Sequence, residues 1–146
     1  MIRRRIDGAA YGVPIAGFTH AVEVSGDCRF VFVSGVTARD AEGRIAGVGD
    51  LAGQTRQVYE NLERILAEAG ATLDDVVRVV TYLRRMDDYP AMHAVRRRYW
   101  PEHAPASTTV EVGQLYDPDQ LLEVEVTAVV PDDRDRRAVG RAADPA

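Results

Sequence analysis

The chain has 146 residues, 46% of them hydrophobic and 28% charged, with a net charge of −5 at pH 7. This length predicts one domain that buries roughly two-thirds of its unfolded surface without disulfides or metals. The 18 basic residues are all arginine, which excludes Schiff-base chemistry on a lysine and a Walker-type phosphate site. The acidic balance argues against nucleic acid as a partner, because phosphate backbones need a basic face.

The amino-terminal stretch MIRRRIDGAA is basic but lacks the apolar core of a signal peptide, and no apolar run approaches the roughly 20 residues of a membrane span. Cys28 is the single cysteine, so an internal disulfide is excluded. These features predict a cytoplasmic protein with no membrane partner.

After an irregular opening, the pattern predicts short strands over Ala21–Ser25 and Phe30–Ser34, joined by a turn at Gly26-Asp27. Every residue of Phe30–Val33 is apolar, which predicts burial on both faces. Arg44–Ala46 is a candidate edge strand.

The first predicted helix covers Leu51–Ala69 and ends at Gly70. The preceding Gly47–Ala52 matches the degenerate dinucleotide fingerprint GxGxxA, but no solid strand comes before it. We therefore expect a glycine turn before a helix rather than a cofactor site. Thr72 and Asp75 resemble a capping box on a single turn.

Val76–Leu83 follows as a continuous apolar strand, which again predicts burial on both faces. A second helix is predicted with Asp88 as its cap and Pro90 in its first turn, and Pro101 ends it. Its packed side is expected to carry three residues at helical spacing, which are Met92, Val95 and Tyr99.

Three consecutive arginines, Arg96, Arg97 and Arg98, lie on this helix. They could grip a phosphate or a carboxylate. Consecutive helix positions point in different directions, however, so the three do not form one fork, and a solvated helix face is the favoured interpretation.

Two runs near the end of the chain, Thr108–Val112 and Leu122–Val130, alternate with period two and are separated by a turn-like segment. They predict a hairpin with a longish loop. In the second run Glu123 and Glu125 fall on the face opposite the apolar residues. They are either a pair suited to acid–base chemistry or solubilising acids on a wet strand face, and the residues alone leave both interpretations open.

The predicted order of strands and helices indicates an α+β fold with two helices on one face of the sheet. Because two strands are expected to be apolar on both faces, another copy of the subunit is the expected cover for the second face. His20, His93 and His103 lack metal-ligand spacing, and no nucleophile elbow surrounds Ser34 or Ser107. We expect no metal and no cofactor.

Several motifs, in this order along the chain, resemble the Rid (YjgF/YER057c/UK114) family. They are Phe18-Thr19-His20-Ala21-Val22, Val31-Phe32-Val33-Ser34-Gly35, Gln54-Thr55-Arg56-Gln57 with Asn61-Leu62, Ala69-Gly70 with Asp74-Asp75-Val76-Val77, Asp87-Asp88-Tyr89, Pro105-Ala106-Ser107-Thr108-Thr109-Val110-Glu111-Val112 and Leu122-Glu123-Val124-Glu125. The resemblance covers roughly residues 17–130 and implies a chorismate-mutase-like fold and a homotrimer with clefts between subunits. We expect a single domain over residues 1–130 and, because the last residues are charged and lack periodicity, a solvated tail over 131–146.

The archetype of that family hydrolyses enamines and imines such as 2-aminoacrylate to a 2-keto acid and ammonia, and it clamps the substrate carboxylate with an arginine. In this chain Ser107 holds the position of that arginine, Phe18 that of a cleft tyrosine and His93 that of a helix asparagine. The resemblance implies that Glu123 handles the attacking water. The expected ligand contacts come from Phe18, Ser34, His93, Ser107 and Thr108.

The first functional hypothesis is therefore an enzyme that hydrolyses or tautomerises a small imine, enamine or related carbonyl compound other than 2-aminoacrylate. The second is a non-catalytic module that binds a small metabolite in the same cleft. A third, an RNA-acting protein, follows from nuclease reports attached to the family name and conflicts with the acidic charge.

Overall fold

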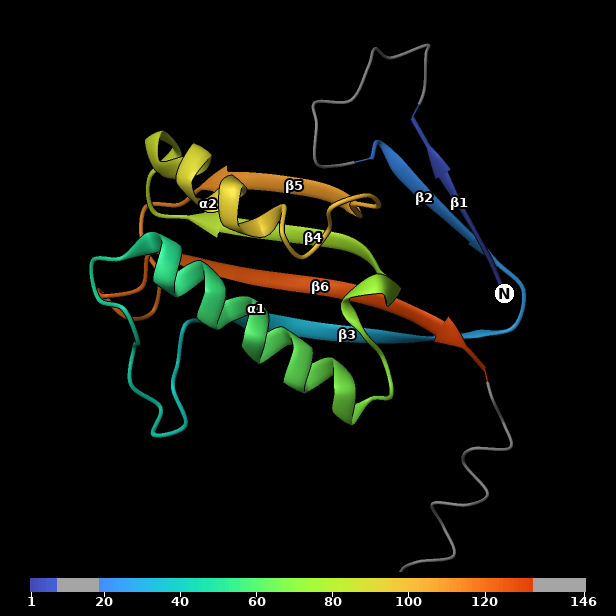
Figure 1. Cartoon of the computed structure of the whole chain (residues 1–146), viewed down its shortest axis with the longest axis horizontal. Coiled ribbons are helices and arrows are strands. Elements are labelled where there is room, and N and C mark those ends of the chain that lie inside the picture. The colour runs from blue at the N-terminus through green and yellow to red at the C-terminus, as the bar shows by residue number, and fades with distance from the viewer. Residues whose placement is uncertain (8–18, 133–146) are drawn as a thin grey trace, which may run out of the picture.

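A computed structural model of the chain describes residues 1–7 and 19–132. Its main sheet has four strands in the order β3-β6-β4-β5 (Figure 1). The strands are β3 (Cys28–Val36), β4 (Val76–Leu83), β5 (Ala106–Glu111) and β6 (Leu122–Pro131). Strand β6 runs antiparallel to β3 and β4, whereas β5 runs parallel to β4. The fold is the predicted α+β class with a mixed sheet.

The predicted hairpin of the last two strands is wrong, because β4 lies between β5 and β6. Both strands exist close to their predicted bounds, but β6 pairs with β3 and β4 and has no ladder with β5. Period-two alternation tells which face each side chain occupies, and it carries no information about which strand is the neighbour.

Helices α1 (Leu51–Glu68) and α2 (Tyr89–Arg96) cover the same face of the sheet (Figure 1). In α1, Val58, Leu62 and Leu66 are fully buried and pack in the single core cluster of the described residues. Asp50 caps this helix by accepting from the Gly53 N–H. Gly70, with φ of 65°, follows its end as predicted.

Helix α2 differs from its prediction at both ends. Asp88 occupies the N-cap position without a side-chain capping bond, and the helix ends at Arg96, before Pro101. A short 3-10 turn, η2 (Met86–Asp88), leads into it, and the Met86 N–H donates to Glu111 Oε2 at 2.7 Å. The predicted turn before β4 is confirmed as η1 (Leu73–Asp75), where the Thr72 N–H donates to Asp75 Oδ2 at 2.9 Å.

The expectation of an irregular opening is wrong. Strand β1 (Ile2–Ile6) pairs antiparallel with β2 (Ala21–Ser25) in a separate two-stranded sheet beside the main one (Figure 1). The sequence of β1 is Ile-Arg-Arg-Arg-Ile. It does not predict a strand, because apolar and polar residues do not alternate in it. Conversely, the candidate edge strand at Arg44–Ala46 is reduced to one isolated bridge between Arg39 and Ile45.

The face of the main sheet opposite the helices is open in the single chain. Phe30 and Phe32 on β3 are 56% and 78% exposed, and their rings stack with centroids 6.0 Å apart. Burial of Phe30–Val33 on both faces is therefore not seen within one protomer. Among the described residues no helix is long and apolar enough to cross a membrane.

Candidate functional site

Glu123 lies near the start of β6 on the open face of the sheet. Its register partner on β4 is Tyr82, and its carboxylate lies directly over Gly35 of β3, where a Cβ atom would overlap it. Ser34, next to Gly35, is exposed. We call Ser34, Gly35 and Glu123 the open-face cluster. Glycine at position 35 leaves the space that the carboxylate occupies.

The two acids of β6 have different surroundings. Glu125 Oε1 lies 3.3 Å from Arg78 Nη1 on β4, so its charge is paired. Within residues 1–7 and 19–132 no ion pair or hydrogen bond of Glu123 is seen. Partial desolvation, followed by the negative charges of the neighbouring Glu125 and Glu123, raises the pKa of the Tyr82 phenol. Of the two candidates, Glu123 is the one whose carboxylate is open to a ligand or a water.

Two side-chain amides on α1 hold the segments that carry this cluster. Gln54, which is fully buried, donates to the Asp119 carbonyl at 2.8 Å and accepts from the Leu121 N–H at 2.9 Å, immediately before β6 begins. Asn61 donates to the carbonyls of Thr37 and Arg39 at 3.1 and 2.9 Å, just after β3 ends. These bonds fix the ends of both strands against the helix.

Ser107 and Thr108 are consecutive on β5, so their side chains point to opposite faces of the sheet. Ser107 pairs in register with Val79, a core residue, and therefore faces the helices. Thr108 pairs with Val80 and faces the open side. A ligand in one protomer can meet only one of the two hydroxyls, which the sequence-based set treated as neighbours.

Ser107 lines a hollow of about 270 Å³ together with Met86, Tyr89 and Thr109. His93 lies one helical turn beyond Tyr89, with the two rings stacked at 5.3 Å and Tyr89 Oη 3.4 Å from His93 Nδ1. The structure thus places His93 against Tyr89, which lines the hollow. The sequence-based set missed Tyr89 and Thr109, although period-two spacing from Ser107 could have found Thr109.

Arg96 is 1% exposed, which corrects the prediction of a solvated arginine face. Its Nη1 donates to Ser107 Oγ at 2.8 Å. The signal was present in the sequence, because Arg96 lies four residues after Met92 and next to Val95, on the packed stripe of the helix. We use the name helix-side cluster for three residues that line the hollow, Tyr89, Ser107 and Thr109, together with His93 and Arg96, which contact Tyr89 and Ser107 respectively.

The two clusters lie far apart in one protomer. Glu123 and Gly35 belong to β6 and β3 on the open face, whereas Ser107 belongs to β5, two strands from β6, on the helix face. Phe18, the remaining predicted contact, lies outside the described residues. The predicted set therefore does not form one site within a single chain.

Other candidate sites carry less chemistry. The GxGxxA segment is a glycine turn, with φ of 61° at Gly47 and 77° at Gly49, leading into α1. In the described part of the chain, histidine, cysteine and acidic side chains form no group of three that could hold a metal ion.

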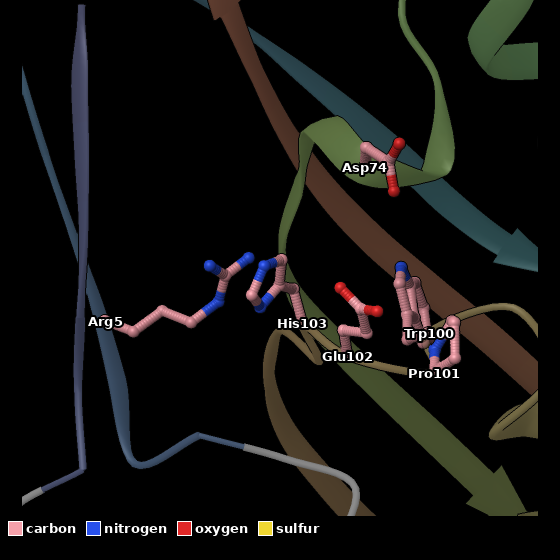
Figure 2. Close-up of a pocket in the computed structure, with 6 residues that line it drawn as sticks. All are labelled: Arg5, Asp74, Trp100, Pro101, Glu102 and His103. Atoms are coloured by element: carbon pink, nitrogen blue, oxygen red, sulfur yellow. The ribbon is translucent and has the colours of Figure 1, made fainter.

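A second hollow, of about 400 Å³, lies between β1 and the segment after α2 (Figure 2). Arg5 reaches toward His103 there, with Glu102 and Trp100 on the far side (Figure 2). Its lining carries both signs of charge and contains none of the predicted site residues, so it does not define one ligand chemistry.

The sheet, its one-sided helices and its two polar clusters define a small α+β protein with polar side chains gathered on opposite faces of the sheet. The sequence profile of the family described as Endoribonuclease L-PSP matches residues 10–130. The chain is 40% identical over 115 residues to a RutC family protein of Pyrococcus abyssi, covering 79% of this chain and 87% of the relative.

It is also 39% identical over 117 residues to the 3-aminoacrylate deaminase RutC of Acinetobacter baylyi, covering 80% of this chain and 90% of that protein. Among solved structures, YyfB of Yersinia pestis, described as a Rid family protein of unknown function, superposes with a TM-score of 0.77 at 35% identity. That match covers 89% of this chain and 100% of YyfB. The chain belongs to the Rid (YjgF/YER057c/UK114) family.

Proposed function

We propose that the protein is a cytoplasmic enzyme that hydrolyses or tautomerises a small imine, enamine or related carbonyl compound. The main support is the position of the Glu123 carboxylate. It lies on a central strand against Gly35 and has no ion-pair partner among the described residues. A relative named 3-aminoacrylate deaminase supports enamine chemistry. Such an acid can take a proton from water or move one between carbon and nitrogen.

In the hydrolytic version, Glu123 accepts a proton from a water molecule while the water oxygen bonds to the imine carbon. Glu123 returns this proton to the imine nitrogen, which gives a neutral carbinolamine. Glu123 then takes the proton of the carbinolamine hydroxyl and delivers it to the amine nitrogen, so that the carbon–nitrogen bond breaks and ammonia leaves as the carbonyl forms. The acid is regenerated as a carboxylate, and the step consumes one water without a metal or organic cofactor.

We further propose that the working site lies between subunits of a homotrimer. The open-face and helix-side clusters cannot contact one ligand in a single protomer, but the open face of one copy can approach the β5 edge of the next. The exposed, stacked Phe30 and Phe32 support this assembly, because exposed apolar patches mark interaction surfaces.

The substrate is proposed to differ from 2-aminoacrylate. A bidentate arginine suits a carboxylate clamp, and Ser107 offers one hydroxyl in its place. Loss of charge-assisted bonding of this kind weakens binding on the order of ten- to a hundredfold.

Turnover of a panel of enamines tests this proposal. Enamines that differ in the position of the amine and in their acidic group are generated enzymatically in the presence of the protein, and ammonia release is followed. We expect accelerated release from at least one member and slow release from 2-aminoacrylate. Binding of a product without any acceleration would instead indicate a non-catalytic module, and cleavage of RNA without enamine turnover would favour the nuclease description.

A further inference from the structure

The contact between Arg96 and Ser107 fixes the direction of the serine hydroxyl. Arg96 Nη1 donates to Ser107 Oγ at 2.8 Å, and the guanidinium is charged at any relevant pH. Arginine carries no acceptor, so the hydroxyl proton cannot return to Arg96. Ser107 must direct that proton to another acceptor, and a hydroxyl polarised by a cation is a stronger donor.

The hollow beside Ser107 is where such an acceptor fits. The hollow is lined by Ser107 and Thr109 of β5 and by Met86 and Tyr89. Further polar side chains lie close to Arg96 and to Thr109. Burial raises the pKa of the Tyr59 phenol while the charge of nearby Arg96 opposes the shift.

Tyr59 Oη and Thr81 Oγ1 are buried, and within the described residues neither has a hydrogen-bond partner. Thr81 is the register partner of Thr109 on the neighbouring strand. One hydroxyl thus lies near the buried cation Arg96 and the other lies beside Thr109, and this group of buried donors favours a ligand that carries acceptor oxygens.

We propose that Arg96 is a positioning residue that turns Ser107 into the anion-facing donor of the site. The ligand is then an imine or enamine that carries a carboxylate or enolate oxygen, held through one oxygen by Ser107 with the Arg96 charge behind it. Position 107 itself carries no positive charge, and Arg96 of α2 supplies that charge through its hydrogen bond to Ser107. The imine or enamine class rests on the proposed function; the preference for an anionic oxygen rests on the Arg96 geometry.

Two matched probes separate charge from shape. 2-Oxobutyrate and 2-oxobutanamide have the same carbon skeleton, but only the first is an anion. Their dissociation constants are measured by titration calorimetry or by amide chemical shifts. The readout is the ratio of the two constants, because a purely structural role of Arg96 would weaken both probes alike and leave the ratio unchanged.

The wild type should prefer the anion. Arg96→Met should lower that preference about tenfold, because a charge near the ligand oxygen is lost. Arg96→Lys keeps the charge and should retain most of the preference. In a Ser107→Ala background, Arg96→Met should have little further effect, since the hydroxyl that transmits the charge is already gone.

Ser107→Thr and Ser107→Ala keep the inference testable if the Arg96 variants do not fold. Both leave Arg96 in place, but only threonine retains a hydroxyl. Threonine should preserve the anion preference and alanine should lose it. Equal preference in these two variants, an unchanged ratio in folded Arg96→Met, or no anion preference in the wild type would overturn the inference.

These binding measurements do not depend on turnover. A protein that prefers the anion through Arg96 and Ser107 but releases no ammonia from any enamine would sustain the inference and contradict the proposed enzyme. Enamine turnover without anion preference would support the proposed enzyme and contradict the role inferred for Arg96.

Discussion

The open-face cluster and the helix-side cluster show how one sheet separates an acid from a cation. Glu123 lies on an uncovered face over a glycine, with no ion pair seen among the described residues. Arg96, the last residue of α2, is 1% exposed and donates to the Ser107 hydroxyl. An accessible carboxylate suits proton transfer, whereas a buried guanidinium suits fixed positioning. In the proposed trimer, the two roles meet around one ligand where two protomers join.

Glu123→Gln should give the largest effect on the proposed activity. The amide keeps the shape of the side chain but cannot accept a proton, so turnover should fall about a hundredfold or more. Ammonia release measures the rate, while circular dichroism and light scattering verify fold and assembly.

Glu125→Gln is the matched control on the same strand face. Its carboxylate pairs with Arg78, whose side chain is 57% exposed. Because exposed ion pairs contribute little, the loss of turnover should be small. Equal losses in both variants would show that general surface charge, rather than Glu123 itself, supports the activity.

Gly35→Ala tests whether the position of the Glu123 carboxylate matters for turnover. The new methyl group would overlap the carboxylate and displace it, which should lower turnover by about tenfold while the backbone tolerates alanine. In the Glu123→Gln background the same change should add little, because the displaced group no longer accepts a proton. Additive losses in the double variant would show that Gly35 acts independently of the acid.

Ser107→Arg tests the other cluster. A planar donor fork at this position should raise activity on 2-aminoacrylate by about tenfold. The gain should be larger when combined with Arg96→Met, since two adjacent guanidinium groups repel each other. Strong wild-type activity on 2-aminoacrylate that the arginine does not improve would contradict the proposed divergence in substrate.

Thr81→Val should have the smallest effect. The Thr81 hydroxyl is fully buried without a partner among the described residues, so an isosteric apolar side chain should leave stability unchanged or increase it by about 1 kcal/mol. Urea unfolding measures the change. A clear destabilisation would indicate that the hydroxyl is hydrogen-bonded in solution.

Several elements of the fold follow from local pattern. Strand β4 matches its predicted bounds, and α1 begins at the predicted residue and ends one residue earlier. Both have strong periodicity and clear stop signals. The pairing of β6 with β3 and β4 does not follow, because strand neighbours depend on contacts distant in sequence.

The site was predictable in parts. Glu123 on a polar strand face follows from alternation, and the opposite directions of Ser107 and Thr108 could have been inferred the same way. Burial of Arg96 was concealed by two further arginines, Arg97 and Arg98, which are exposed. Three consecutive arginines suggest a solvent-exposed segment, whereas the helical spacing from Met92 places Arg96 on the buried side of α2.

Subunit mixing tests the intersubunit site most directly. Glu123→Gln removes the acid, and Ser107→Phe fills the hollow beside the helix, so each homotrimer alone should be inactive. In randomly mixed trimers of equal amounts, about a quarter of the interfaces combine an intact Glu123 from one protomer with an intact Ser107 from the next. Recovery of about a quarter of wild-type turnover is the predicted result. Verified mixed trimers that remain inactive would contradict a site shared between subunits.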